Sequence, residues 1–215
     1  MMKKGVILLS GGLDSAVTLY YAKNKGYKLE ALIFDYGQRH KKEINFAKKI
    51  ARINNIRYHL LKIDLSWTES SLTKKGIKVP SAGGRGIPVT YVSGRNIIFL
   101  SYAFSLAESI RAKSIFIGAH VQDYSGYPDC HLQFMKDFQA AVRKGLKKKD
   151  ISIKTPLIKK TKKQIVNLGI SLDVPFKYTW SCYEGGKIPC LRCDSCCFRT
   201  AAFKALGRKD PIMEA

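Results

Sequence analysis

The sequence predicts an α/β protein with a parallel five-stranded sheet and helices on both faces, a Rossmann-like arrangement. Two observations support this prediction. Strand-like and helix-like segments alternate along most of the chain, and the strand-like segments are apolar at nearly every position. Strands that are apolar throughout are typical of parallel sheets, because helices cover both faces of such sheets.

The expected elements follow one another in this alternating order. The strands are predicted at residues 6–9, 29–36, 58–65, 114–120 and 151–157. The helices are predicted at residues 15–25, 43–53, 95–112, 131–146, 161–172 and 199–206. Residues 66–92 are rich in glycine and proline and have no sustained period, so we expect a long loop or lid there.

The length and composition are those of one main domain with a small addition. A chain of 215 residues with 46% hydrophobic content can bury one substantial core. We expect a domain at residues 1–175 and a C-terminal segment at 176–215 packed on it. Polar residues interrupt the first apolar run, which excludes a membrane span or a signal peptide there, so we expect a cytoplasmic protein.

The formal net charge of +22 has two interpretations. A basic surface attracts polyanions such as ATP or RNA. A lysine-rich solvated surface explains the runs at residues 143–150 and 159–163 equally well, and no aromatic residues for base stacking are interleaved with them. The charge alone does not decide between these interpretations, and we expect no nucleic-acid partner.

The segment SGGLDS directly follows the first predicted strand, and it predicts a phosphate-binding loop. Two glycines let the backbone approach a phosphate, the serines add hydroxyl donors, and the helix start presents free N–H groups. An aspartate among phosphates requires a divalent cation, so we assign Asp14 to Mg²⁺. The alternative is a glycine-rich turn without a ligand. The predicted ATP-binding residues here are Ser10, Gly11, Gly12, Leu13, Asp14 and Ser15.

This loop is neither a Walker A loop, because the required lysine is missing, nor a G-x-G-x-x-G fingerprint. It resembles the PP-loop of the N-type ATP pyrophosphatases, which have the adenine nucleotide alpha hydrolase-like fold. The resemblance implies that ATP is cleaved between its α- and β-phosphates to adenylate a carboxylate or carbonyl oxygen. It also implies catalytic roles for Asp14 and Ser15.

Further motifs narrow the resemblance. The stretches FDYGQRH, TYVSGRN, DYSGYPDC, TPLIKKTKKQIV and TWSCYEGGKIPCLRCDSCCFR, together with SGGLDS, resemble the 7-cyano-7-deazaguanine synthase family from residue 6 to about residue 211. The resemblance implies an ATP-dependent ligase that converts 7-carboxy-7-deazaguanine and ammonia into the nitrile, for queuosine or archaeosine synthesis. It also implies a homodimer. The alternatives are a synthase that stops at the amide and a thiolase-like PP-loop enzyme that modifies tRNA.

The resemblance also suggests roles for individual residues. Arg95 would hold the substrate carboxylate or the α-phosphate, because a guanidinium binds such oxygens bidentately, and Lys162 would approach the phosphates. Helix capping, a polar turn and a solvated lysine run are the respective alternatives for Asn96, Asp123 and Lys162. The predicted substrate-binding residues are Tyr91, Arg95, Asn96, Asp123, Tyr124 and Ser125, and the further nucleotide-binding residues are Asp35, Gln38 and Arg39.

The cysteines near the C-terminus have the spacing of a structural Zn²⁺ site. Cys190, Cys193 and Cys196 follow an x₂ spacing, and Cys182 precedes them as a fourth ligand. Cys197 competes with Cys196 for the last position, and the spacing and the family pattern both favour Cys196. Leu191 stands where the family usually has glycine, which indicates a positive φ at this position.

Overall fold

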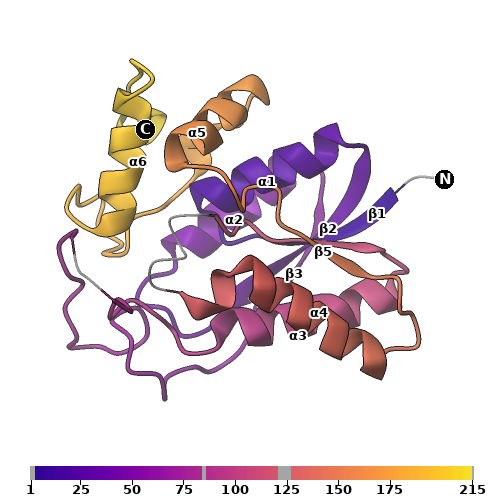
Figure 1. Ribbon diagram of the computed structural model, residues 1–215. Coiled ribbons are helices and arrows are strands. Elements are labelled where there is room, and N and C mark those ends of the chain that lie inside the picture. The colour runs from indigo at the N-terminus through magenta and orange to yellow at the C-terminus, as the bar shows by residue number, and fades with distance from the viewer. Residues whose placement is uncertain (1–2, 84–85, 121–126, 215) are drawn as a thin grey trace.

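The computed structural model describes residues 3–83, 86–120 and 127–214. Figure 1 shows a central sheet between two helical layers. The strands are β1 (Lys3–Leu8), β2 (Tyr27–Asp35), β3 (Arg57–Lys62), β4 (Ser114–Phe116) and β5 (Ser152–Lys154). The α-helices are α1 (Leu13–Asn24), α2 (Lys42–Ile53), α3 (Arg95–Ser109), α4 (Leu132–Gly145), α5 (Lys162–Ser171) and α6 (Asp194–Lys204). Short 3₁₀ turns are η2 (Pro128–Cys130), η3 (Phe176–Tyr178) and η4 (Pro211–Glu214).

The sheet has five parallel strands, as predicted, and their order is β3-β2-β1-β4-β5. β1 lies at its centre, where Gly5 is in register with Leu29 of β2 on one side and Ser114 of β4 on the other. Val6 and Ile7 are fully buried because helices cover both faces of this strand. The apolar character that identified the strands therefore reflects their burial on two sides.

Two hydrophobic cores lie on opposite faces of the sheet. On one face, α1, α2, α5 and α6 pack over residues such as Ile7 and Ile33. On the other face, α3 and α4 pack over Val6 and Ile115, with Leu100 and Phe104 among the buried residues. Figure 1 shows α1 and α5 on one side of the sheet and α3 and α4 on the other. The predicted fold class is confirmed. Among the described residues, no helix is long and apolar enough to cross a bilayer.

The carboxyl edge of the sheet opens between β1 and β4, where the chain leaves β1 toward one face and β4 toward the other. In open parallel sheets such a point forms the ligand crevice. β4 ends at Phe116, short of the predicted residue 120. Beyond this end the chain packs closely on the start of α1, where a Cβ atom on Gly118 would lie 3.0 Å from the carbonyl carbon of Asp14.

The long segment between β3 and α3 contains no α-helix or β-strand in its described residues, as predicted. Its ends and middle are anchored by the buried side chains of Leu65, Leu72 and Val92. The Arg39 N–H donates to the carbonyl of Leu72 at 2.6 Å, and the Ala82 N–H donates to the carbonyl of Arg192 at 2.9 Å. The segment therefore connects the end of β2 with the C-terminal segment.

The last helix begins earlier than the sequence predicted. α6 starts at Asp194 and not near residue 199. Its N-cap is Cys193, which has an extended backbone. α6 packs against α5, which joins the C-terminal segment to the core of the main sheet. The boundary at residue 175 stays a prediction.

Arg199 of α6 is the polar centre of the C-terminal segment and is only 4% exposed. Its guanidinium donates to both carboxylate oxygens of Asp210, at 2.6 and 2.8 Å. It also donates to the hydroxyl and carbonyl oxygens of Thr179 and to the carbonyl of Phe176. A planar fork of donors suits such a bidentate pair, so one side chain connects α6 with the two segments on either side of it.

We expect Arg199→Ala to lower the free energy of unfolding by about 3–5 kcal/mol, because it leaves the buried Asp210 carboxylate without an opposite charge. The exposed Arg208 of the same segment is the matched control, and Arg208→Ala should change stability by less than about 0.5 kcal/mol. Urea denaturation of both variants measures the difference. Equal stabilities would show that the Arg199 network does not hold the segment in place.

Candidate functional site

A cavity of about 260 Å³ opens at the carboxyl edge of β1, β2 and β4. Its walls come from the loop after β1, the segment after β2, the start of α3, the η2 region and the C-terminal segment. The lining residues include Ser10, Asp14, Gln38, Glu43, Arg95, Asn96, Cys130, Trp180 and Tyr183. The predicted phosphate loop and the predicted substrate-binding arginine therefore share one cavity.

The loop after β1 is held in shape by contacts on two sides. Gly11 has φ +84°, and a Cβ atom there would lie 2.1 Å from the carbonyl oxygen of Glu43. The Trp180 N–H donates to the Gly11 carbonyl at 2.9 Å. The Ser10 hydroxyl accepts from the Gly12 N–H at 3.2 Å and lies 3.1 Å from the Ser15 hydroxyl. Only glycine fits at position 11, since both φ and the close approach exclude a side chain.

Asp14 lines the cavity and forms an ion pair with Lys162. The Lys162 ammonium donates to both Asp14 oxygens at 2.8 Å, and it also lies 2.8 Å from Nε2 of His120. Burial alone would raise the pKa of Asp14, but the charges and hydrogen bonds of Lys162 and His120 lower it well below its ordinary value. Asp14 therefore remains an anion in the buried loop. His120, which is 3% exposed, was not identified from the sequence.

Arg95 begins α3 and reaches across to the segment after β2. Its guanidinium donates to the Tyr36 hydroxyl at 3.1 Å and lies 5.5 Å from the centre of that ring. Its neighbour Asn96 uses its side-chain amide locally, donating to the Asp129 carbonyl at 3.4 Å and to the sulfur of Cys130 at 3.3 Å. The hydrogen bond to Tyr36 holds Arg95 at the cavity wall, and the guanidinium has further N–H groups that can donate to a ligand.

The buried Asp129 is a second residue that sequence reasoning missed. Its carboxylate accepts the backbone N–H of Asn96 at 3.0 Å, which caps α3 from a distant part of the chain. The motif containing Asp129 was recognised in the sequence, but its role depends on a contact between segments about thirty residues apart. No local spacing signals such a contact.

Several predicted site residues do not line the cavity. Gly11 packs behind the loop, and Asp35 forms an ion pair with Lys41 outside the cavity. The Tyr91 hydroxyl accepts the Gly94 N–H at 3.2 Å, and its ring packs against Tyr127. Gln38 and Arg39 do line the cavity. Asp123, Tyr124 and Ser125 lie outside the described residues. The roles assigned to all these residues stay predictions.

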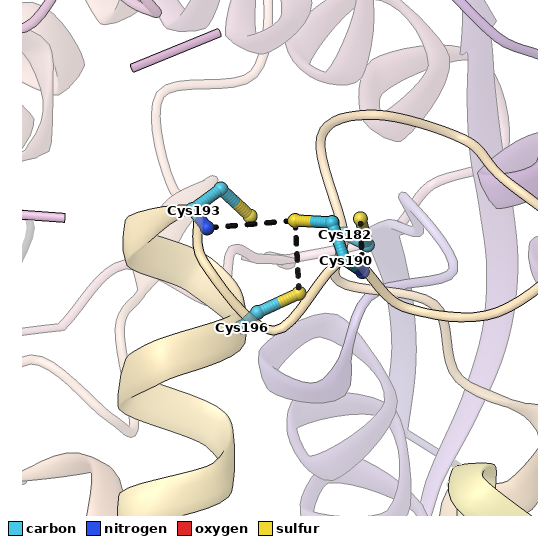
Figure 2. A group of neighbouring side chains, drawn as sticks. All are labelled: Cys182, Cys190, Cys193 and Cys196. Atoms are coloured by element: carbon cyan, nitrogen blue, oxygen red, sulfur yellow. Dashed lines mark hydrogen bonds between the residues drawn. The ribbon is translucent and has the colours of Figure 1, made fainter. Parts of the chain in front are cut away.

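The four predicted cysteine ligands lie together, as Figure 2 shows. The ligand atoms of Cys182, Cys190, Cys193 and Cys196 are all within 4.8 Å of one another. Backbone N–H groups donate to the sulfurs of Cys182 and Cys190 at 3.3 and 3.4 Å. Hydrogen bonds from Cys193 and Cys196 lower the pKa of Cys182 and raise the pKa values of the two donor thiols, so the sulfurs are close enough to share protons. Four sulfurs at this separation fit one tetrahedral ion.

The structure selects Cys196 over Cys197. The Cys197 sulfur lies 3.6 Å from the Leu191 carbonyl oxygen and is outside the group of four. Leu191 has φ +58°, as the glycine usual at this position in the family indicated. The loop between the second and third cysteines therefore keeps the left-handed turn without glycine.

Comparison with known proteins identifies the family. The profile described as "Queuosine biosynthesis protein QueC" matches residues 4–207. The chain belongs to the QueC family. A 7-cyano-7-deazaguanine synthase of Trichodesmium erythraeum is 47% identical over 221 residues, covering 98% of this chain and 100% of that protein. The synthase of Thermoplasma volcanium is 44% identical, covering 99% of this chain and 91% of that protein.

These matches confirm the prediction of a 7-cyano-7-deazaguanine synthase of queuosine biosynthesis, an ATP-dependent ligase. Solved structures support the fold alone. An NMN synthetase of Francisella tularensis aligns with TM-score 0.53 at 17% identity, covering 95% of this chain and 77% of that one. An NH3-dependent NAD synthetase of Campylobacter jejuni aligns with TM-score 0.51 at 16% identity, covering 81% and 66%.

In this QueC-family protein, we expect Gly11→Ala to lower the free energy of unfolding by at least about 1–2 kcal/mol, because a side chain is strained at positive φ and would strike the Glu43 carbonyl. Gly12→Ala is the matched control. Gly12 has φ −75°, and a new Cβ would meet the rotatable Ser10 hydroxyl at 3.3 Å and the Trp180 carbonyl oxygen at an ordinary contact distance of 3.6 Å, so the loss should stay below about 1 kcal/mol. Thermal and urea unfolding measure both. A larger loss for Gly12→Ala would contradict the packing described.

We also expect Cys196→Ser to lose the bound metal and Cys197→Ser to keep it, because only the Cys196 sulfur belongs to the group of four. Elemental analysis of the purified proteins measures the metal content per chain. The melting temperature should fall with Cys196→Ser and stay near the parent value with Cys197→Ser. Metal retained by Cys196→Ser and lost by Cys197→Ser would reverse the assignment.

Proposed function

We propose that the protein converts 7-carboxy-7-deazaguanine and ammonia into the nitrile by adenylating first a carboxylate and then an amide. The shared cavity carries this proposal, because the PP-loop and Arg95 line the same space. ATP bound at the loop would present its α-phosphorus toward a carboxylate held by Arg95. Holding both reactants in one orientation lowers the entropic part of the barrier.

The first round forms an amide. A substrate carboxylate oxygen attacks the α-phosphorus of ATP, and pyrophosphate leaves. The carboxyl carbon becomes electrophilic, since its oxygen now leaves as AMP. Ammonia attacks this carbon and loses a proton. Arg95 suits the role of holding the carboxylate, because its guanidinium binds two oxygens at once.

The second round would use the same cavity, because both acceptors are oxygens on the same ring substituent. The amide oxygen attacks the α-phosphorus of a second ATP, and the amide nitrogen loses a proton. AMP then leaves with the carbon–oxygen bonding electrons, while the remaining N–H proton is lost and the nitrile forms. The N–H donors around Gly11 and Gly12 suit the departing pyrophosphate in both rounds.

Mg²⁺ and Lys162 would share the phosphate charge. Asp14 is the carboxylate of the loop, and one carboxylate plus phosphate oxygens is a common ligand set for Mg²⁺, which neutralises charge on the leaving pyrophosphate. In the structure Lys162 occupies both Asp14 oxygens. We infer that Lys162 turns from Asp14 to the phosphates when the nucleotide binds. His120 would hold the other side of the ammonium during this change.

Zn²⁺ is the ion we propose for the four cysteines. Four sulfur ligands close the coordination shell, so the ion would be structural. Trp180, Ser181 and Tyr183 of the same segment line the cavity, which places the metal-bound segment beside the substrate.

Metal binding requires reduced thiols, so we propose a cytoplasmic protein. We also propose a homodimer, which the resemblance to the family implies.

The assay combines Mg-ATP, ammonium and 7-carboxy-7-deazaguanine, and it follows AMP release and product mass. Nitrile formation is the expected result. A product that stops at the amide would refute the second adenylation. AMP release that requires tRNA would favour a thiolase-like enzyme, although four of the six cysteines are grouped as metal ligands.

We expect Asp14→Asn to reduce AMP release by at least about 100-fold, because it removes the carboxylate that would hold Mg²⁺ beside the phosphates without changing side-chain size. The exposed Asp137 of α4 provides the control, and Asp137→Asn should retain the parent rate. Steady-state rates of both variants, with circular dichroism as a check on folding, measure the effect. Full turnover by a folded Asp14→Asn variant would remove Asp14 from the proposed mechanism.

A further inference from the structure

Glu43 is an acidic residue of the cavity to which neither the sequence motifs nor the proposed chemistry assigns a role. It lies in the first turn of α2 and lines the cavity together with Asp14 and Arg95. Its backbone carbonyl packs against Gly11 of the phosphate loop. Glu43 is therefore fixed beside the place where we expect ATP and the substrate carboxylate to meet.

One oxygen of the Glu43 carboxylate is held by a rigid neighbour. Gln38 is 7% exposed, and its side-chain oxygen accepts the Tyr36 N–H at 2.8 Å. Its amide nitrogen donates to the Phe34 carbonyl and to Oε1 of Glu43, both at 3.1 Å. Both N–H groups of Gln38 are used, so its orientation is fixed. Within residues 3–83, 86–120 and 127–214, no other hydrogen bond or ion pair reaches the Glu43 carboxylate, which leaves Oε2 for a ligand.

Opposite charges share this cavity without pairing. Within the same described ranges, Glu43 and Arg95 form no ion pair within 4.0 Å, although each influences the pKa of the other. Burial raises the pKa of Glu43, and the nearby His40, Arg95 and Gln38 lower it only in part. A carboxylate in this environment gains from a bound cation and is a better proton acceptor than an exposed one.

We propose that Glu43 binds the ammonium ion that supplies the nitrogen and takes the first proton from it. This inference rests on the function proposed above. Ammonium must lose a proton before its nitrogen has a free electron pair. Glu43 takes that proton, the nitrogen attacks the carboxyl carbon of the adenylate, and AMP leaves with the carbon–oxygen bonding electrons. The second N–H proton goes to solvent, which completes the amide.

Ammonium fits this position better than the ring edge of the substrate. The amidine-like edge of a guanine analogue offers two parallel N–H donors, which pair with both oxygens of a free carboxylate. Gln38 already occupies one Glu43 oxygen, so a ligand with a single donor suits the other. Arg95, on the same cavity wall, would also place the reacting carboxylate near Glu43, and the ring edge would lie further away.

The test is the ammonium dependence of Glu43→Gln, which keeps the side-chain size and the oxygen that accepts from Gln38. We expect the KM for ammonium to rise about 10- to 100-fold, because the substitution removes one charge-assisted hydrogen bond and such a bond changes affinity by about this factor. The KM values for ATP and for the carboxylate substrate should stay at those of the parent protein. Glu43→Asp, which keeps the charge, should retain part of the ammonium affinity. Glu69→Gln is the matched control, because Glu69 is exposed and pairs with Lys74 away from the cavity.

Ammonium-independent exchange between ATP and pyrophosphate, driven by 7-carboxy-7-deazaguanine, separates this inference from the proposed function. We expect exchange in the parent and in Glu43→Gln at similar rates. A parent protein without exchange would refute the adenylation, and the ammonium site with it. Exchange in both proteins with an unchanged KM for ammonium would overturn the Glu43 assignment alone. A rise in the KM for the carboxylate substrate instead would assign Glu43 to the ring edge and overturn the ammonium site.

Discussion

The close packing of Gly11 is the constraint on which the site depends. Its Cα lies so near the start of α2 that a side chain would overlap the Glu43 carbonyl, and its own carbonyl accepts the N–H of Trp180. Three parts of the chain therefore meet at one glycine: the loop after β1, the first turn of α2 and the C-terminal segment. A shift in any of them changes the space left for the phosphates, because packed backbone cannot deform independently.

Three of the charged side chains that line the cavity each have their own hydrogen-bond partner. Asp14 is paired with Lys162, Arg95 is held by Tyr36, and Glu43 is held by Gln38. Arg95 and Glu43, whose partners are held by further contacts, are preorganised, and such groups need little rearrangement when charge develops in the transition state. These three positions are the ones to which we assign the phosphate chain, the carboxylate and the ammonium ion in the proposed mechanism.

The C-terminal segment has a small apolar cluster, which includes Trp180 and Ile212 and is completed by Val79 of the long loop. Polar and cysteine contacts add to this small core. The four cysteines lie together at one end of the segment. The buried Arg199 of α6 pairs with Asp210 and also donates to Thr179, which follows η3. This segment contributes Trp180 and Tyr183 to the cavity wall. Stability of the tail and shape of the site are therefore coupled.

The sequence by itself determined the fold class and the family, because strand hydrophobicity, the SGGLDS motif and the cysteine spacing are patterns within short stretches of the chain. The same motif predicts the phosphate loop. The tertiary structure decided which adjacent cysteine joins the cluster, since Cys196 and Cys197 differ only in the direction that α6 gives their side chains. It also revealed Asp129 and His120, whose partners lie far away in the sequence, and Glu43, which shares the cavity with Asp14 and Arg95 of other elements. Spacing along the chain reports the residues one element can present together, whereas contacts between elements depend on how the sheet and its two helical layers pack.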